Sequence, residues 1–244
     1  MVVPSPNAAF GGSREPHAAS IGGRLNWLRA GVLGANVGIV STASLVVGVA
    51  GATSDRGALV TAGIAGLFAG ALSMAVGEYV SVSTQRDTER ALLAKERGEL
   101  ADDPEGELRE LAEIYEYKGL SPDVARQVAR ELTDRDALAA HAEVELRLDP
   151  DELTSPWQAG AASFVAFTVG ALLPVLAIVL APAGIRVAVT FVAVLIGLAV
   201  TGSLSAKLGG ARRRPAIVRV MLGGALAMAI TFGIGVLVGS TGLT

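Results

Sequence analysis

The chain has 244 residues, of which 51% are hydrophobic and only 18% are charged, and its mean hydropathy is +0.52. Soluble globular domains carry about 25% charged residues, so this composition argues against a purely soluble protein. The net charge of −3 is too small to favour nucleic acid as a partner. The absence of cysteine excludes disulfides, thiolate metal sites and thiol catalysis.

The first segment, residues 1–23, is rich in Ala, Gly, Ser and Pro and contains no continuous apolar run. Such a segment is not a signal peptide, and we expect a disordered, exposed tail. Five nearly uncharged segments follow, each long enough to cross a hydrocarbon core of about 30 Å. The predicted membrane spans are residues 27–52, 57–82, 157–181, 185–206 and 216–237.

Most of the acidic residues and many of the basic ones lie in an insert between the second and third spans. The second span runs on without a helix breaker through residues 83–100, and breakers then delimit helices at 105–117, from Pro122, and at 134–148. The chain is therefore predicted to be an all-α membrane protein with five transmembrane helices. Its predicted parts are a tail (1–23), two spans (24–83), a charged helical insert (84–153) and three spans (154–244).

Orientation follows from Lys and Arg in the short loops, which stay on the cytoplasmic side. Basic residues precede the first span and lie between the fourth and fifth: Arg14, Arg24, Arg29, then Lys207, Arg212, Arg213, Arg214 and Arg219. An odd number of spans allows both groups to face the cytoplasm. The N-terminus and the insert are therefore predicted to be cytoplasmic in a multi-pass integral membrane protein.

Three pairs of glycines are spaced four residues apart within the spans: Gly34/Gly38, Gly66/Gly70 and Gly235/Gly239. Helices in lipid gain little from the hydrophobic effect, and small residues allow their backbones to approach closely. The sequence leaves open whether these pairs pack helices within one chain or join two chains.

Acidic residues of the insert recur at helical spacing and are the first candidate for metal binding. They are Glu96 and Glu99 on one helix, Glu107, Glu110 and Glu113 on the next, and Glu143 and Glu145 just after His141. If the helices fold back on one another, a divalent cation would offset the repulsion between these carboxylates. The alternative is a solvated acidic face paired with the insert's arginines, with a structural histidine.

The second candidate lies in the membrane, where an ionisable residue is a functional hypothesis by default. Met74 and Glu78 share one face of the second span, although Glu78 is near its end and Met74 also suits simple packing. Ser41 and Ser44 fall on a stripe of the first span with Val37, as a candidate pore lining. Such hydroxyls often bond only their own backbone. No nucleophile elbow, zinc-protease motif or phosphate loop is present, which predicts that the chain is not an enzyme.

Together these features resemble the vacuolar iron transporter family, especially its bacterial members. The resemblance covers nearly the whole chain after the tail. It is most specific at residues 33–42 (LGANVGIVST), 71–80 (ALSMAVGEYV) and 139–146 (AAHAEVEL).

The resemblance implies a five-span homodimer in the lipid bilayer, here of the bacterial plasma membrane, without an organic cofactor. It implies export of Fe²⁺, and often Mn²⁺, from the cytosol in exchange for protons. The family's cytoplasmic helical domain binds metal through glutamates, which match Glu96, Glu99, Glu107, Glu110 and Glu145 here. The family's intramembrane methionine matches Met74.

Two departures from the family pattern matter. His141-Ala142 replaces a methionine pair, and histidine still binds Fe²⁺ or Mn²⁺. Val37 replaces an aspartate of the translocation site, and valine neither binds a cation nor carries a proton. Two interpretations follow. One is a proton-coupled exporter whose insert collects metal and whose dimer interface, at spans one and two, passes it. The other is a transport-deficient relative that binds or buffers metal.

Overall fold

The computed structural model describes residues 19–150 and 154–242, and all regular structure within them is helical. The helices are α1 (Ala19–Ala52), α2 (Arg56–Asp102), α3 (Pro104–Tyr117), α4 (Pro122–His141), the π-helix η2 (Ala142–Leu146), α5 (Pro156–Leu180), α6 (Arg186–Leu208) and α7 (Arg213–Ser240). Five of them are long and apolar enough to cross a membrane, which confirms the predicted all-α class and the five spans. The predicted tail lies mostly outside the described residues, and α1 already begins at Ala19.

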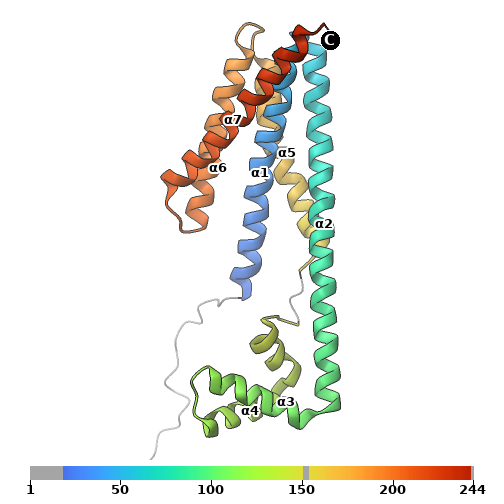
Figure 1. Ribbon diagram of the computed structural model, residues 1–244, viewed down its shortest axis with the longest axis vertical. Coiled ribbons are helices and arrows are strands. Elements are labelled where there is room, and N and C mark those ends of the chain that lie inside the picture. The colour runs from blue at the N-terminus through green and yellow to red at the C-terminus, as the bar shows by residue number, and fades with distance from the viewer. Residues whose placement is uncertain (1–18, 151–153, 243–244) are drawn as a thin grey trace, which may run out of the picture.

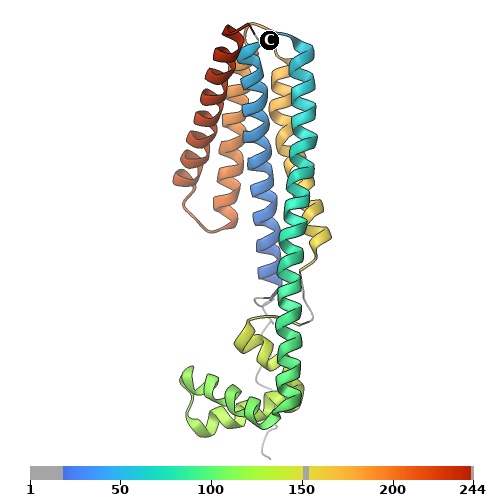
Figure 2. The same cartoon turned by 45° about the vertical axis from the view of Figure 1, so that its right-hand side comes forward.

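The membrane bundle is built around α1, which packs against α2, α5, α6 and α7 (Figures 1 and 2). Its core contains buried aliphatic side chains from all five helices. They include Ile39, Val46 and Val47 of α1, Leu59 of α2, Ile178 of α5, Val194 and Leu198 of α6, and Met228 of α7. Each span therefore has one inward face, and its outward face also carries large apolar side chains, as expected for a helix surrounded by lipid.

The three glycine pairs pack helices within this one chain. A Cβ atom on Gly38 would collide with the carbonyl oxygen of Phe167 on α5, and one on Gly235 with the carbonyl oxygen of Gly48 on α1. On α2, Gly70 accommodates the ring of Phe167. Close helix contact inside the bundle therefore accounts for each pair.

Helix α2 is much longer than a membrane span and connects the bundle to the insert. It begins at Asp55, whose carboxylate accepts hydrogen bonds from the backbone N–H groups of Gly57 and Ala58 at 3.0 and 3.1 Å. Its 47 residues measure about 70 Å at 1.5 Å per residue, more than twice the hydrocarbon thickness. The predicted continuation through residues 83–100 is confirmed, and this half of α2 projects beyond the bundle (Figure 1).

The insert folds back against the projecting half of α2 through α3, α4 and η2. The sequence predicts separate third and fourth insert helices, and the structure separates them within α4 by a kink at Asp136, whose backbone (φ −165°, ψ 96°) is not helical. The Asp136 carboxylate accepts a hydrogen bond from the Ala139 N–H and so starts the second half of α4. The last part of the fourth predicted insert helix (134–148) is the π-helix η2. It ends at Arg147, whose backbone is in the left-handed conformation (φ 55°).

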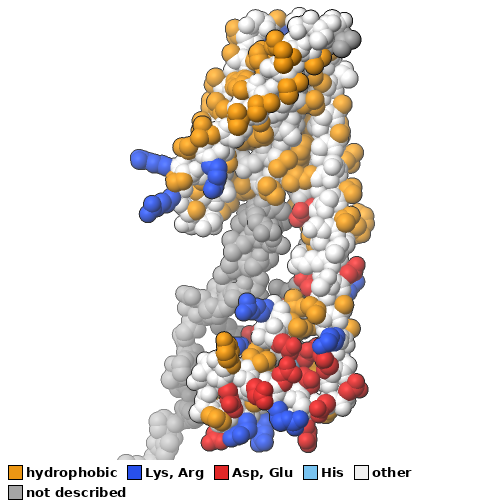
Figure 3. Space-filling model, in the orientation of Figure 1, with side chains coloured by type: hydrophobic (Ala, Val, Ile, Leu, Met, Phe, Trp, Pro, Cys, Tyr) orange, Lys and Arg blue, Asp and Glu red, His pale blue; other side chains and the backbone are white. Residues whose placement is uncertain are grey.

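The two ends of the bundle differ in charge. The α1–α2 turn and the end of α7 lie at one end, and the basic α6–α7 turn lies toward the insert (Figures 1 and 3). Acidic side chains gather on the insert and on the projecting half of α2 (Figure 3). The sequence predicts that the α6–α7 turn and the insert lie on the same side of the membrane, and this arrangement agrees with that prediction.

Candidate metal centre

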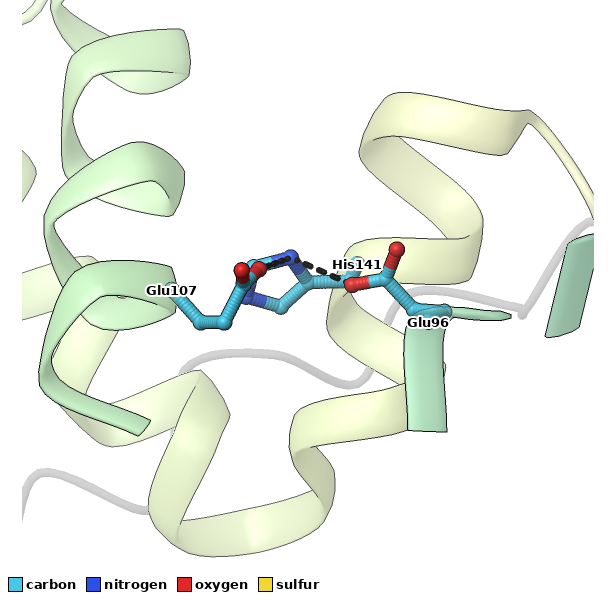
Figure 4. A group of neighbouring side chains, drawn as sticks. All are labelled: Glu96, Glu107 and His141. Carbon is cyan, nitrogen blue, oxygen red and sulfur yellow. Dashed lines mark ion pairs between the residues drawn. The ribbon is translucent and has the colours of Figure 1, made fainter. Parts of the chain in front are cut away.

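Side chains from three helices meet in the insert next to α2. Glu96 of α2, Glu107 of α3 and His141 at the end of α4 each offer a ligand atom, and these atoms lie within 4.8 Å of one another (Figure 4). His141 Nδ1 is 3.0 Å from Glu96 Oε1 and 3.6 Å from Glu107 Oε2. Glu145 Oε2 of η2 lies 3.8 Å from the same nitrogen. We call Glu96, Glu107 and His141 the cluster.

Local structure explains why these residues converge. The Asp103-Pro104 turn reverses the chain, and the Asp103 carboxylate accepts a hydrogen bond from the Gly106 N–H at 2.9 Å. Glu107 then lies in the first turn of α3 and faces back toward Glu96. The π-helical turn after His141 brings Glu145 beside the imidazole, and such turns are frequent at functional sites.

Two residues of the cluster are buried, and three of their polar atoms lack hydrogen bonds. His141 is 0% exposed and Glu96 is 3% exposed. Glu96 Oε1 is close to His141 Nδ1, but neither atom makes a hydrogen bond of acceptable direction, and His141 Nε2 has no partner either. A buried polar atom without a partner costs free energy. A cation held by the lone pair of His141 Nδ1 and by the carboxylates would remove that cost for Nδ1 and for Glu96 Oε1.

The electrostatics of the cluster also favour a cation. Burial raises the pKa of the Glu96 carboxyl above its ordinary value of 4.5, and repulsion from Glu145 and Glu107 adds to this against an opposing effect of His141. Burial likewise raises the pKa of Glu107, with Glu110 as the next cause. Carboxylate oxygens combined with one imidazole suit divalent first-row metals such as Fe²⁺ and Mn²⁺.

The other predicted insert ligands do not reach the cluster. Glu99 is 42% exposed and pairs with Lys95, whose Nζ lies 2.7 Å from its carboxylate. Glu110, Glu113 and Glu143 are exposed. The structure thus brings together Glu96, Glu107, His141 and, at the rim, Glu145.

The residues of the predicted membrane path lie on α1 and α2, and their burial differs. Val37 and Ser41 face outward, and the Ser41 hydroxyl donates to the Val37 carbonyl oxygen at 2.7 Å. The Ser44 hydroxyl is buried without a hydrogen-bond partner, and Met74 is half-buried against a group of apolar side chains from α2 and α5 that includes Phe167. Glu78 is half-buried as well.

One buried acid was not singled out from the sequence. Glu89 on the projecting half of α2 is 8% exposed. Its Oε1 accepts a hydrogen bond from Gln85 Nε2 at 2.8 Å, and its Oε2 has no partner. The available signal was its position seven residues before Glu96, which places both on one face of a helix.

The sequence of this chain is similar to those of known membrane transporters. A family model described as the VIT family matches residues 28–236. The chain is 46% identical to a vacuolar iron transporter of Acanthamoeba castellanii over 225 residues, 91% of this chain and 82% of that protein. It is 39% identical to vacuolar iron transporter homolog 4 of Arabidopsis thaliana over 221 residues, 90% of this chain and 88% of that protein. It is 38% identical to vacuolar iron transporter homolog 1 of Oryza sativa subsp. japonica over 246 residues, 100% of this chain and 88% of that protein. These relatives are named as transporters, in agreement with the prediction that the chain is not an enzyme.

Proposed function

This chain belongs to the VIT family, and we propose that it moves a divalent metal cation, Fe²⁺ or Mn²⁺, out of the cytosol in exchange for protons. The observation that carries the proposal is the cluster, because two of its three residues are buried and one of these, Glu96, lies on a helix continuous with a membrane span. The names of the relatives support metal as the substrate.

In this proposal the insert collects the metal on the cytoplasmic side of a bacterial plasma membrane. A cation reaching the cluster displaces protons from Glu96 and Glu107, since carboxylates bind metal only when ionised. Because burial raises the pKa of each carboxyl above its ordinary value of 4.5, this exchange depends on pH above the usual range of a carboxyl. Oxygen and nitrogen ligands of this kind accept either Fe²⁺ or Mn²⁺.

A second copy of the chain is proposed to pack against α1 and α2. Their outward side carries large apolar side chains, among them Val37 and Leu45 of α1 and Phe68 and Leu72 of α2. The glycine pairs are already used inside the bundle, so these larger side chains would form the dimer contact.

A membrane-anchored metal-binding or buffering protein is the second candidate, and Val37 favours it. From Arg56 to Val82, Glu78 is the only acidic residue of α2, and α1 has none in its described spanning part. A dehydrated cation in low dielectric needs compensating charge, since its cost is several kcal/mol or more. Slow transport is therefore expected for this chain.

The test combines metal binding and flux on the full chain. Glu107→Gln should weaken Mn²⁺ binding at least about 100-fold, equivalent to about 2.7 kcal/mol. In the Val37→Asp background it should reduce Mn²⁺ flux in reconstituted vesicles. Glu113→Gln is the matched control, because it makes the same change on an exposed position of α3. Binding without flux, both in this chain and in Val37→Asp, would support buffering. Equal binding by both glutamine variants would contradict a metal site in the cluster.

A further inference from the structure

We propose that Glu89 is a relay ligand that takes the cation from the cluster and passes it toward Glu78 at the membrane end of the same helix. The inference rests on the proposed function and adds a binding position between the insert and the membrane. It is carried by the burial of Glu89, by its unpartnered oxygen and by its place on α2.

Glu89 lies on the same buried face of α2 as the cluster. Beyond the membrane, the buried residues of α2 are Val82, Glu89, Leu93 and Glu96, at intervals of seven, four and three. These intervals keep side chains on one face of an α-helix, and Glu78 continues that face four residues before Val82. Along the axis, Glu89 is about 10 Å from Glu96 and about 16 Å from Glu78.

One of the two oxygens of the Glu89 carboxylate is free to bind a cation. Gln85 Nε2 fixes Oε1 at 2.8 Å, whereas Oε2 is buried and has no hydrogen-bond partner. Among the ion pairs formed by the described residues, none involves Glu89. A buried carboxylate oxygen without a donor or a cation costs free energy, and a metal ion would satisfy it.

Glu89 is better suited to bind the cation transiently than to store it. The cluster offers an imidazole and two carboxylates, whereas Glu89 offers one carboxylate, and water would fill the remaining coordination sites of the cation. Fewer protein ligands give weaker binding and faster release. Asp87, two residues earlier on the same helix, is exposed and does not share this face.

Glu89→Gln tests the relay, because it removes the charge and keeps the shape beside Gln85. Mn²⁺ flux in vesicles is measured in the Val37→Asp background, because the flux of this chain is expected to be slow, and it should fall at least tenfold. The Mn²⁺ affinity of the cluster should change less than twofold. Asp87→Asn, the matched control, should alter neither quantity. A loss of cluster affinity as large as the loss of flux would show that Glu89 only supports the fold.

Anomalous diffraction from crystals of the full chain soaked with Mn²⁺ gives a readout that does not depend on flux. A peak is expected at Glu89 Oε2 in addition to one in the cluster, and Glu89→Gln should remove only the former. The absence of a Glu89 peak overturns the relay. Unchanged flux in Glu89→Gln, with flux abolished in Glu107→Gln, overturns the relay alone. Unchanged flux in Glu107→Gln overturns the proposed function instead.

Discussion

Glu96→Gln should have opposite effects on the metal-free and the metal-bound protein. The ligand atoms of Glu96 and Glu107 lie within 4.8 Å of each other. Two ionised carboxylates at that distance repel by about 3 kcal/mol at an effective dielectric constant of 20. The raised pKa of each group and the attraction of His141 reduce this repulsion. We therefore expect the glutamine variant to stabilise the metal-free insert by about 1 kcal/mol.

The same substitution removes an anionic ligand from the cation. We expect Mn²⁺ affinity to fall at least about 100-fold, which corresponds to about 2.7 kcal/mol. Stability and affinity then change in opposite directions because the carboxylate is unfavourable without metal and favourable with it. If Glu96 had only a structural role, the substitution would lower the stability of both the metal-free and the metal-bound protein.

Both quantities are measurable on the full chain in detergent. Hydrogen exchange of peptides from α3 and η2 reports local stability, and calorimetric titration with Mn²⁺ reports affinity. Glu113→Gln is the control, because its side chain is exposed and outside the cluster. Faster exchange in metal-free Glu96→Gln would show that Glu96 serves mainly to hold His141. Unchanged affinity would show that the cation binds elsewhere.

Three further outcomes are expected. Because burial raises the folded-state pKa of the two cluster carboxyls, the metal-free insert should gain stability as the pH falls from neutrality toward 4.5, and should lose it as the pH rises through the raised values. Over the same window calorimetry should show Mn²⁺ affinity weakening with acidification, and an affinity independent of pH would exclude these ligands. An impermeant thiol reagent added to intact cells should label Ser240→Cys and not Ala101→Cys, and the reverse pattern would refute the orientation. Gly235→Ala should destabilise the detergent-solubilised protein by about 1–3 kcal/mol, because its Cβ would collide with Gly48, whereas Gly233→Ala has open space and should be tolerated. Equal thermal unfolding of the two variants would contradict the close α1–α7 packing.

The spans were predictable because a long apolar run has few stable alternatives to a membrane helix. Placement of the insert ligands was only partly predictable. Glu96 and Glu99 are three residues apart, yet one is buried in the cluster and the other pairs with Lys95 at the surface. Helical spacing shows which acids share a face, but tertiary packing decides which of those side chains are covered.

Other features depend on backbone geometry that the residue pattern did not reveal. The π-turn after His141 brings Glu145 to the rim of the cluster. Glu89 was overlooked because an isolated acid in a charged segment is usually solvated, whereas here the fold covers it. The outward position of Val37 likewise follows from the rotation of α1 within the bundle.

Proton-coupled Mn²⁺ flux in reconstituted vesicles, compared between this chain and Val37→Asp, tests the central claim most directly. Mid-membrane hydroxyls and the Met74 thioether supply no charge, so slow or undetectable flux is expected for the chain as it stands. Val37→Asp should raise the flux at least tenfold and couple it to a pH gradient. Equal, proton-coupled flux by the two proteins would show that the carboxylate is dispensable and would contradict this account of transport.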